Sequence, residues 1–98
     1  MIAKLGIYED CTKAEPTKVY ECHRLLYGVS KKALAFAEEA EKKKTLAEQE
    51  AVMVELLQTI FPTFEAAELD KIDPAELETL IDNLRGKSAA EAERVEKN

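Results

Sequence analysis

The chain has 98 residues, of which 46% are hydrophobic and 35% are charged, and its formal net charge is −6 at pH 7. This length suits one domain with a single small hydrophobic core, and the mixture of apolar and charged residues is typical of amphipathic helices. The acidic balance disfavours nucleic acid as a partner, because binding to phosphates is driven by Lys and Arg side chains that displace counterions.

Two short strands are expected at the N-terminus. Residues 2–8, IAKLGIY, alternate in the manner of a strand, and residues 17–26, TKVYECHRLL, are rich in β-branched and aromatic types. The polar connection EDCTKAEP between them predicts an antiparallel hairpin. Two strands alone are marginally stable in water, so helices are expected to cover one face.

Cys11, Cys22 and His23 are candidate metal ligands, since thiolates and imidazoles bind zinc. Neighbouring side chains of a strand point to opposite faces, however, which separates Cys22 from His23. We therefore expect no metal, no cofactor and two free thiols, although a disulfide is open if the two segments pair. No apolar run suits a signal peptide or the roughly 18 residues of a membrane span, so an intracellular protein is expected.

A first helix is expected from Ser30, which can cap its start after a break at Gly28, to the lysine run at residues 42–44. Thr45 and Glu48 then fit a capping box that opens a second helix. The alternative is one long helix that bends near Thr45.

The second helix carries the strongest apolar stripe of the chain and is stopped by Pro62. Thr63 can cap a short helical turn over residues 65–69. Asp73 and Pro74 then supply the N-cap and first residue of a last helix.

Glu76, at the third position of that last helix, fits a capping role, and Gly86 is expected to end the helix. Residues 87–98 offer Val95 as their one large apolar side chain and are expected to form a mobile or frayed tail. The predicted fold is therefore mainly α: a single domain over residues 1–86, with about four helices and a short N-terminal antiparallel β-hairpin.

The segment IFPTFEAAELDKIDPAEL, residues 60–77, is the one candidate acidic site. It lacks the glycine that a calcium-binding loop needs at its sixth position, and Asp73 and Glu76 are explained by helix capping. The remaining acids are expected on the solvated side of a short helix: Glu65, Glu68 and Asp70. The chain also has no glycine-rich phosphate loop and no nucleophile motif, so we expect no catalytic residues and no enzymatic activity.

Four apolar residues of the same segment are the candidate partner-binding residues: Phe61, Phe64, Leu69 and Ile72. They lie on a bent linker between helices, where a small core need not cover all of them. One interpretation is that they close the bottom of the core. The other is a partially exposed patch or groove for another protein.

The order of these elements resembles the tail assembly chaperones of tailed bacteriophages and prophages. The resemblance extends over residues 2–86 and is greatest over residues 50–85, where LLQTIFP ends an apolar helix and FEAAELDKIDPAELETLIDNLRG follows. It implies a small, mostly α-helical protein of the bacterial host cytoplasm. Such a protein reversibly binds tape measure protein, tail tube protein or both, and keeps them soluble until the tail assembles.

The residues also allow a second interpretation, a small acidic adaptor or regulatory module that uses the same apolar stripes to bind one partner. Tail genes beside this reading frame would favour the chaperone, and a toxin or regulator gene would favour the adaptor. In either case no nucleic acid and no membrane is expected as a partner, and a homo-oligomer is left open.

Overall fold

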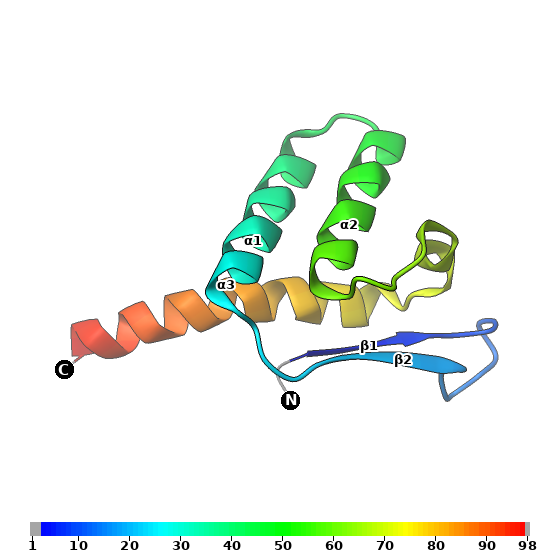
Figure 1. Ribbon diagram of the computed structural model, residues 1–98, viewed down its shortest axis with the longest axis horizontal. Helices are drawn as coiled ribbons and strands as arrows, with labels where there is room; N and C mark the ends of the chain where they lie inside the picture. The colour runs from blue at the N-terminus through cyan, green and yellow to red at the C-terminus, as the bar shows by residue number, and fades with distance from the viewer. Residues whose placement is uncertain (1–2, 98) are drawn as a thin grey trace.

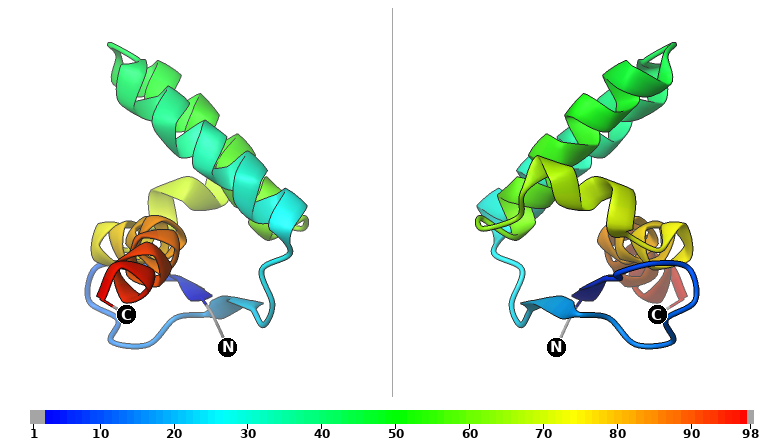
Figure 2. Two further views of the ribbon diagram at one scale, coloured as in Figure 1. Left: turned by 90° about the vertical axis from the view of Figure 1, so that its left-hand side faces the viewer. Right: turned by 90° about the vertical axis from the view of Figure 1, so that its right-hand side faces the viewer.

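The computed structural model describes the backbone of residues 3–97 and the side chains of residues 4–85. Its elements in chain order are β1 (Ala3–Ile7), β2 (Lys18–Cys22), α1 (Tyr27–Lys42), α2 (Leu46–Ile60), the 3-10 helix η1 (Ala66–Lys71) and α3 (Pro74–Lys97). The predicted fold class is confirmed, because four helices follow a two-stranded antiparallel sheet in the described chain. Figures 1 and 2 show α1 and α2 as a helical hairpin on one side of α3, with the strands on the other side.

The two strands pair in a register that turns one face of the hairpin toward the helices. Leu5 lies opposite Tyr20, and both side chains are buried. Lys4 and Glu21, the next pair along, are exposed. This alternation is the period of two that the sequence predicts, and it gives the small sheet one apolar face.

The predicted start of the first helix is wrong. α1 begins at Tyr27, so Gly28 and Ser30 lie inside its first turn, and the N-cap Leu26 makes no side-chain capping bond. The backbone N–H of Ser30 donates to the carbonyl of Leu26 at 2.9 Å. Because this helix end is exposed, water can satisfy its other N–H groups, and no capping side chain is needed.

Thr45 separates α1 from α2, as predicted. Its hydroxyl accepts a hydrogen bond from the backbone N–H of Glu48 at 3.2 Å, which satisfies one donor of the first turn of α2. α2 then ends at Ile60, two residues before Pro62. One long helix bent near Thr45 is therefore not what the chain forms.

The short helix after Pro62 begins later than predicted, because η1 has Glu65 rather than Thr63 at its N-cap. α3 starts at Pro74 as predicted. The carboxylate of Asp73 accepts the backbone N–H of Ala75 at 2.9 Å and so caps this helix.

Gly86 does not end α3, which continues to Lys97. The residues that follow Gly86 include Ala, Glu, Lys and Arg, which are strong helix formers, so one glycine is not enough to stop the backbone. The predicted tail at residues 87–98 falls on side chains outside the described residues, and its mobility stays a prediction.

A single core joins both strands to all three α-helices. Its buried residues are Leu5, Ile7, Tyr20, Cys22, Ala33, Ala37, Leu56, Leu57, Phe61, Phe64, Leu80 and Leu84. The ring of Tyr20 packs against Phe61 and Phe64, with ring centroids 5.5 Å and 5.7 Å apart. Small side chains on α1 let this helix lie close to its neighbours.

Replacing Phe64 by alanine should lower the free energy of unfolding by about 3–5 kcal/mol, because it removes a buried ring and leaves a cavity beside Tyr20. Urea unfolding followed by circular dichroism measures this change. The control is Leu26→Ala, whose side chain is 60% exposed and whose loss should change stability by less than about 0.5 kcal/mol. Equal effects of the two substitutions would contradict the burial of Phe64.

Candidate functional site

The structure divides the four candidate partner-binding residues into two pairs. Phe61 is 4% exposed and Phe64 is 2% exposed, and both belong to the core. The expected exposed patch is therefore not found at these two residues, which close the core instead. Leu69 and Ile72 are only partly buried and line a groove. Partner binding stays a prediction for all four.

An open groove of about 260 Å³ lies between α2 and the segment that runs from η1 into α3. We call it the α2–α3 groove. Its lining residues are Leu46, Gln49, Glu50, Met53, Leu69, Asp70, Ile72, Pro74 and Leu77. Most of these side chains are apolar, and no aromatic ring is among them. The groove is thus a concave apolar surface that includes two of the four predicted residues, Leu69 and Ile72.

The α2 wall of the groove comes from one face of that helix. Its four residues follow the spacing i, i+3, i+4 and i+7, which places them on adjacent turns: Leu46, Gln49, Glu50 and Met53. The buried residues of α2, Val52, Leu56 and Leu57, lie further along the helix on an overlapping face, since Leu57 follows Met53 at i+4 and Glu50 at i+7. The apolar pattern of α2 is therefore one stripe, whose C-terminal part is buried in the core and whose N-terminal part lines the groove.

Leu46 is the most exposed residue of this wall, with 69% of its surface accessible to solvent. It occupies the first position of α2, next to the cap at Thr45. The apolar stripe that the sequence shows over the second helix begins with Leu46, and this residue is exposed because it lies at the N-terminal end of the stripe, before the buried residues. Leu46 and Met53 are accordingly groove residues that the sequence did not single out.

The charged residues that line the groove are both acids, Glu50 and Asp70. Over residues 4–85, neither carboxylate forms an ion pair with a Lys or Arg side chain. The amide of Gln49 is already engaged, because its Nε2 donates to the carbonyl of Lys43 at 3.1 Å. The groove therefore combines an apolar lining with two carboxylates that form no ion pair with a Lys or Arg among residues 4–85.

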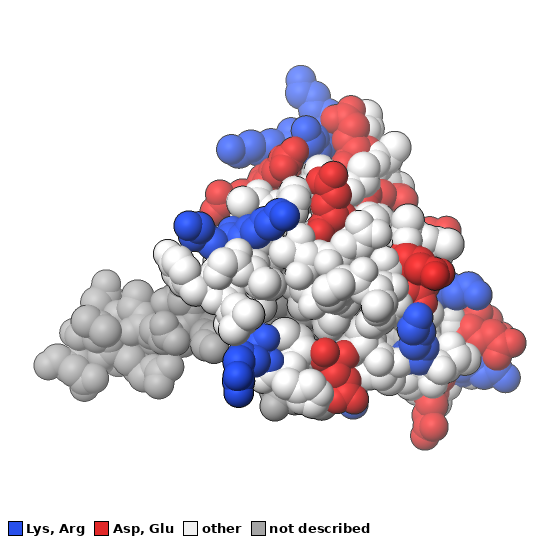
Figure 3. Space-filling view, viewed as in Figure 1, with Lys and Arg blue, Asp and Glu red and all other residues white. Residues whose placement is uncertain are grey.

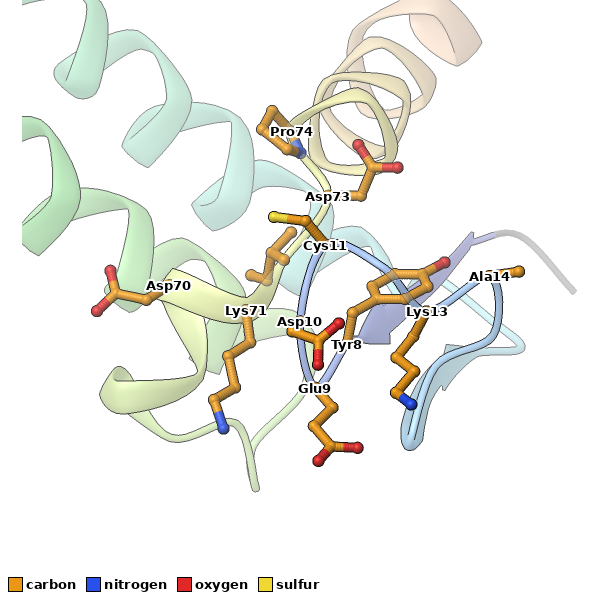
Figure 4. Close-up of a pocket in the computed structure, with 11 residues that line it drawn as sticks. Tyr8, Glu9, Asp10, Cys11, Lys13, Ala14, Asp70, Lys71, Asp73 and Pro74 are labelled. Carbon is orange, nitrogen blue, oxygen red and sulfur yellow. The ribbon is translucent and has the colours of Figure 1, made fainter.

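A second pocket, of about 380 Å³, lies between the loop after β1 and the linker at residues 70–74 (Figure 4). Its lining mixes acids, lysines and one thiol with a tyrosine and apolar side chains: Tyr8, Glu9, Asp10, Cys11, Lys13, Ala14, Asp70, Lys71, Ile72, Asp73 and Pro74. The hydroxyl and the backbone N–H of Thr12 donate to the carboxylate of Asp10, which lowers the pKa of that carboxyl. Because the linker lines both hollows, it forms the wall between this pocket and the α2–α3 groove.

Another exposed apolar site lies where α1 begins. Leu26 is 60% exposed and Tyr27 is 79% exposed, and the ammonium of Lys31 lies 5.4 Å from the centre of the Tyr27 ring. Figure 3 shows a broad uncharged area at the centre of this face of the molecule, between the charged tips of the helical hairpin and the strands. No lining of the two hollows described above includes Leu26 or Tyr27.

Glu68 joins η1 to the β-hairpin. It was expected on the solvated side of a short helix, and this expectation is wrong. Its carboxylate accepts hydrogen bonds from the hydroxyl of Tyr20, from the backbone N–H of Glu65 at 3.0 Å and from the ammonium of Lys18 at 3.2 Å. The hydroxyl of Tyr20 also donates to the carbonyl of Thr63 at 3.2 Å. A polar cluster thus fixes the linker after α2 on the strand β2.

Glu76 likewise reaches across to the strand β1. Its carboxylate accepts the backbone N–H of Gly6 at 2.9 Å and the hydroxyl of Tyr8, so the side chain makes a tertiary contact where the sequence predicted a cap. The hydrogen bond from Glu76 raises the pKa of Tyr8. A Cβ at Gly6 would lie 3.0 Å from the side chains of Pro16 and Tyr8, so any larger residue here would force these neighbours to shift by a few tenths of an ångström.

The candidate metal ligands do not converge. Cys11 is exposed, Cys22 is buried, and both are free thiols. His23 lies 3.3 Å from Glu21. Among the residues that the structure describes, no group of three His, Cys, Asp or Glu side chains could hold a metal ion, and no helix has the length and hydropathy to cross a membrane.

Comparison with protein-family models, with curated proteins and with solved structures found no match. The interpretation of the site therefore rests on its own geometry. On that basis the α2–α3 groove is the candidate functional site, because it is hollow, apolar and accessible.

Glu68 should make stability depend on pH. Desolvation raises the pKa of this carboxyl, but the hydrogen bonds from Tyr20, Glu65 and Lys18 outweigh it, so the pKa lies below its ordinary value of 4.5. A lowered pKa in the folded state stabilises the fold above the ordinary value, and this contribution is lost as the pH falls through the folded pKa.

We therefore expect Glu68→Gln to lower the free energy of unfolding by about 1 kcal/mol at pH 7, with the difference from wild type shrinking toward pH 3. Urea unfolding at a series of pH values measures the difference. Glu78→Gln, at an exposed position of α3, is the control and should have little effect at any pH. A deficit for Glu68→Gln that did not change with pH would show that the charge of Glu68 is not involved.

Proposed function

We propose that the protein is a tail assembly chaperone of a tailed bacteriophage or prophage, and that it holds tape measure protein, tail tube protein or both in soluble form through the α2–α3 groove. The observation that carries this proposal is the groove itself, an accessible apolar surface that the acids Glu50 and Asp70 also line. The sequence pattern over residues 50–85 supports the choice of family. All residues that line the groove belong to that segment, except Leu46 and Gln49.

The contacting residues in this proposal differ from those that the sequence suggested. Leu69 and Ile72 remain, and Leu46, Met53 and Leu77 join them as groove residues. The two phenylalanines support the linker from within the core. The proposed client contact is therefore made by groove residues at the surface, and Phe61 and Phe64 do not take part in it.

Binding would be reversible because the groove is small. Burying one side chain of the size of leucine contributes roughly 1.5–3 kcal/mol, so a few client residues in the groove give modest affinity. Tail polymerisation would offer the client a much larger interface and displace the chaperone. The net charge of −6 keeps the complex soluble until then.

A small acidic adaptor that binds one regulatory partner is the second candidate function. The limited volume of the groove, about 260 Å³, favours a single short segment from the partner and is compatible with this role. The order of genes around the reading frame separates the two candidates. Genes for tail tube and tape measure proteins on either side support the chaperone.

Leu46→Glu tests the chaperone, because it places a charge at the exposed mouth of the groove without disturbing the core. Co-expression with the tape measure and tail tube proteins of the same genome should show that wild type keeps the client soluble and co-purifies with it. Loss of one apolar anchor should weaken the complex about tenfold to a hundredfold.

The matched control is Leu26→Glu, since Leu26 is also an exposed leucine at the start of a helix but lies outside the groove. This variant should retain the client as wild type does. Equal retention by Leu46→Glu and wild type would reject the groove as the client site, and no retention by wild type would reject the chaperone function.

A further inference from the structure

We infer that the α2–α3 groove binds an amphipathic α-helix whose apolar face is flanked by Lys or Arg. This inference rests on the proposed function for its biological setting, and it adds the chemistry that the client segment must present. Three features of the groove support it: the nature of its walls, the charge of its lining and its size.

The walls favour a helix because they offer side chains and no strand edge. Most lining residues belong to α2, η1 and α3, whose backbone groups are used inside those helices. In the linker, the N–H of Ile72 donates to the carbonyl of Leu69 at 3.5 Å, and Pro74 has no N–H. An extended segment would enter the groove with backbone groups left unpaired, whereas a helix satisfies its own.

The spacing of the α2 wall also suits a helical ligand. Its residues repeat at i, i+3, i+4 and i+7 along α2, and Leu69, Ile72 and Leu77 supply the facing wall. Amphipathic helices bind such grooves through apolar side chains at the same spacing on their own surface. The ligand would lie between α2 and the start of α3 and extend the helical packing by one element.

The charge of the lining determines what should flank the apolar face. Glu50 and Asp70 present carboxylates, which accept hydrogen bonds and cannot donate them. Within residues 4–85 neither carboxylate has a Lys or Arg partner, so a cationic ligand can supply one. Complementary charges at the rim of an interface speed association and select the partner.

Size disfavours a small molecule as the ligand. The groove holds about 260 Å³, which is below the roughly 300–1,000 Å³ of ordinary small-molecule sites. A helix needs only to place a few side chains in it, while the rest of the helix lies on the rims. The groove is therefore better suited to part of a larger partner.

Two synthetic peptides of about 15–20 residues, long enough for measurable helicity, test the inference against the full chain. Both have leucines at helical i, i+3, i+4 and i+7 spacing, one with lysines flanking that face and the other with glutamates in their place. Fluorescence anisotropy should show binding of the lysine peptide roughly tenfold tighter than the glutamate peptide at low salt, and added salt should reduce the difference.

Charge reversal in the protein locates the effect. Glu50→Lys and Asp70→Lys should each weaken the lysine peptide by roughly twofold to fivefold and strengthen the glutamate peptide. Glu55→Lys is the control, since Glu55 is exposed on α2 and does not line the groove. The same loss for Glu55→Lys would show that only net charge matters and would overturn the inference.

Further outcomes would also overturn it. The first is equal binding of the two peptides. The second is undiminished binding of a lysine peptide in which a central proline prevents helix formation. The third is occupation of the groove by a second copy of the chain, seen as dimers that Leu46→Glu abolishes. The inference and the proposed function can fail separately. Retention of the client without peptide discrimination would leave the chaperone role intact, whereas peptide discrimination without client retention would leave only the helix-binding groove.

Discussion

The contact between the ring of Tyr20 and the two phenylalanines that follow α2 is the interaction on which the rest of the fold depends. This contact packs β2 against the segment after α2, where Pro62 keeps the helix from continuing. Once the ring is in place, its hydroxyl reaches the carbonyl of Thr63 and the carboxylate of Glu68, so η1 is held on the hairpin. The second wall of the α2–α3 groove therefore exists because an aromatic cluster fixes the linker from beneath.

This arrangement separates stability from binding within one short segment. Phe61 and Phe64 contribute buried surface, while Leu69 and Ile72 remain partly accessible above them. Glu68 and Glu76 fasten the segment to opposite strands, and Asp70 is left at the groove. Substitutions a few residues apart should therefore have different consequences, some for folding and others for the partner.

Local signals predicted much of the fold, and tertiary contacts account for what they missed. Thr45 and the Asp73–Pro74 pair act within one helical turn, so their roles could be inferred from neighbouring residues. The partners of Glu68 and Glu76, Tyr20 and Tyr8, are 48 and 68 residues away in sequence, and no periodic pattern connects them. The same limit applies to Leu46, because a helical stripe does not reveal whether the core or a groove covers it.

The contacts of Glu76 and of the Lys71 carbonyl with β1 have a consequence for how copies of the protein could meet. They occupy the N–H groups of Gly6 on the outer side of β1 and of Tyr8 just after it, whereas the outer edge of β2 has no neighbouring strand within residues 3–97. Strand pairing between copies would therefore favour β2 against β2, because the outer edge of β1 is partly occupied. A pair of copies joined in this way would present only the partly occupied edges of β1, which works against further edge-to-edge growth.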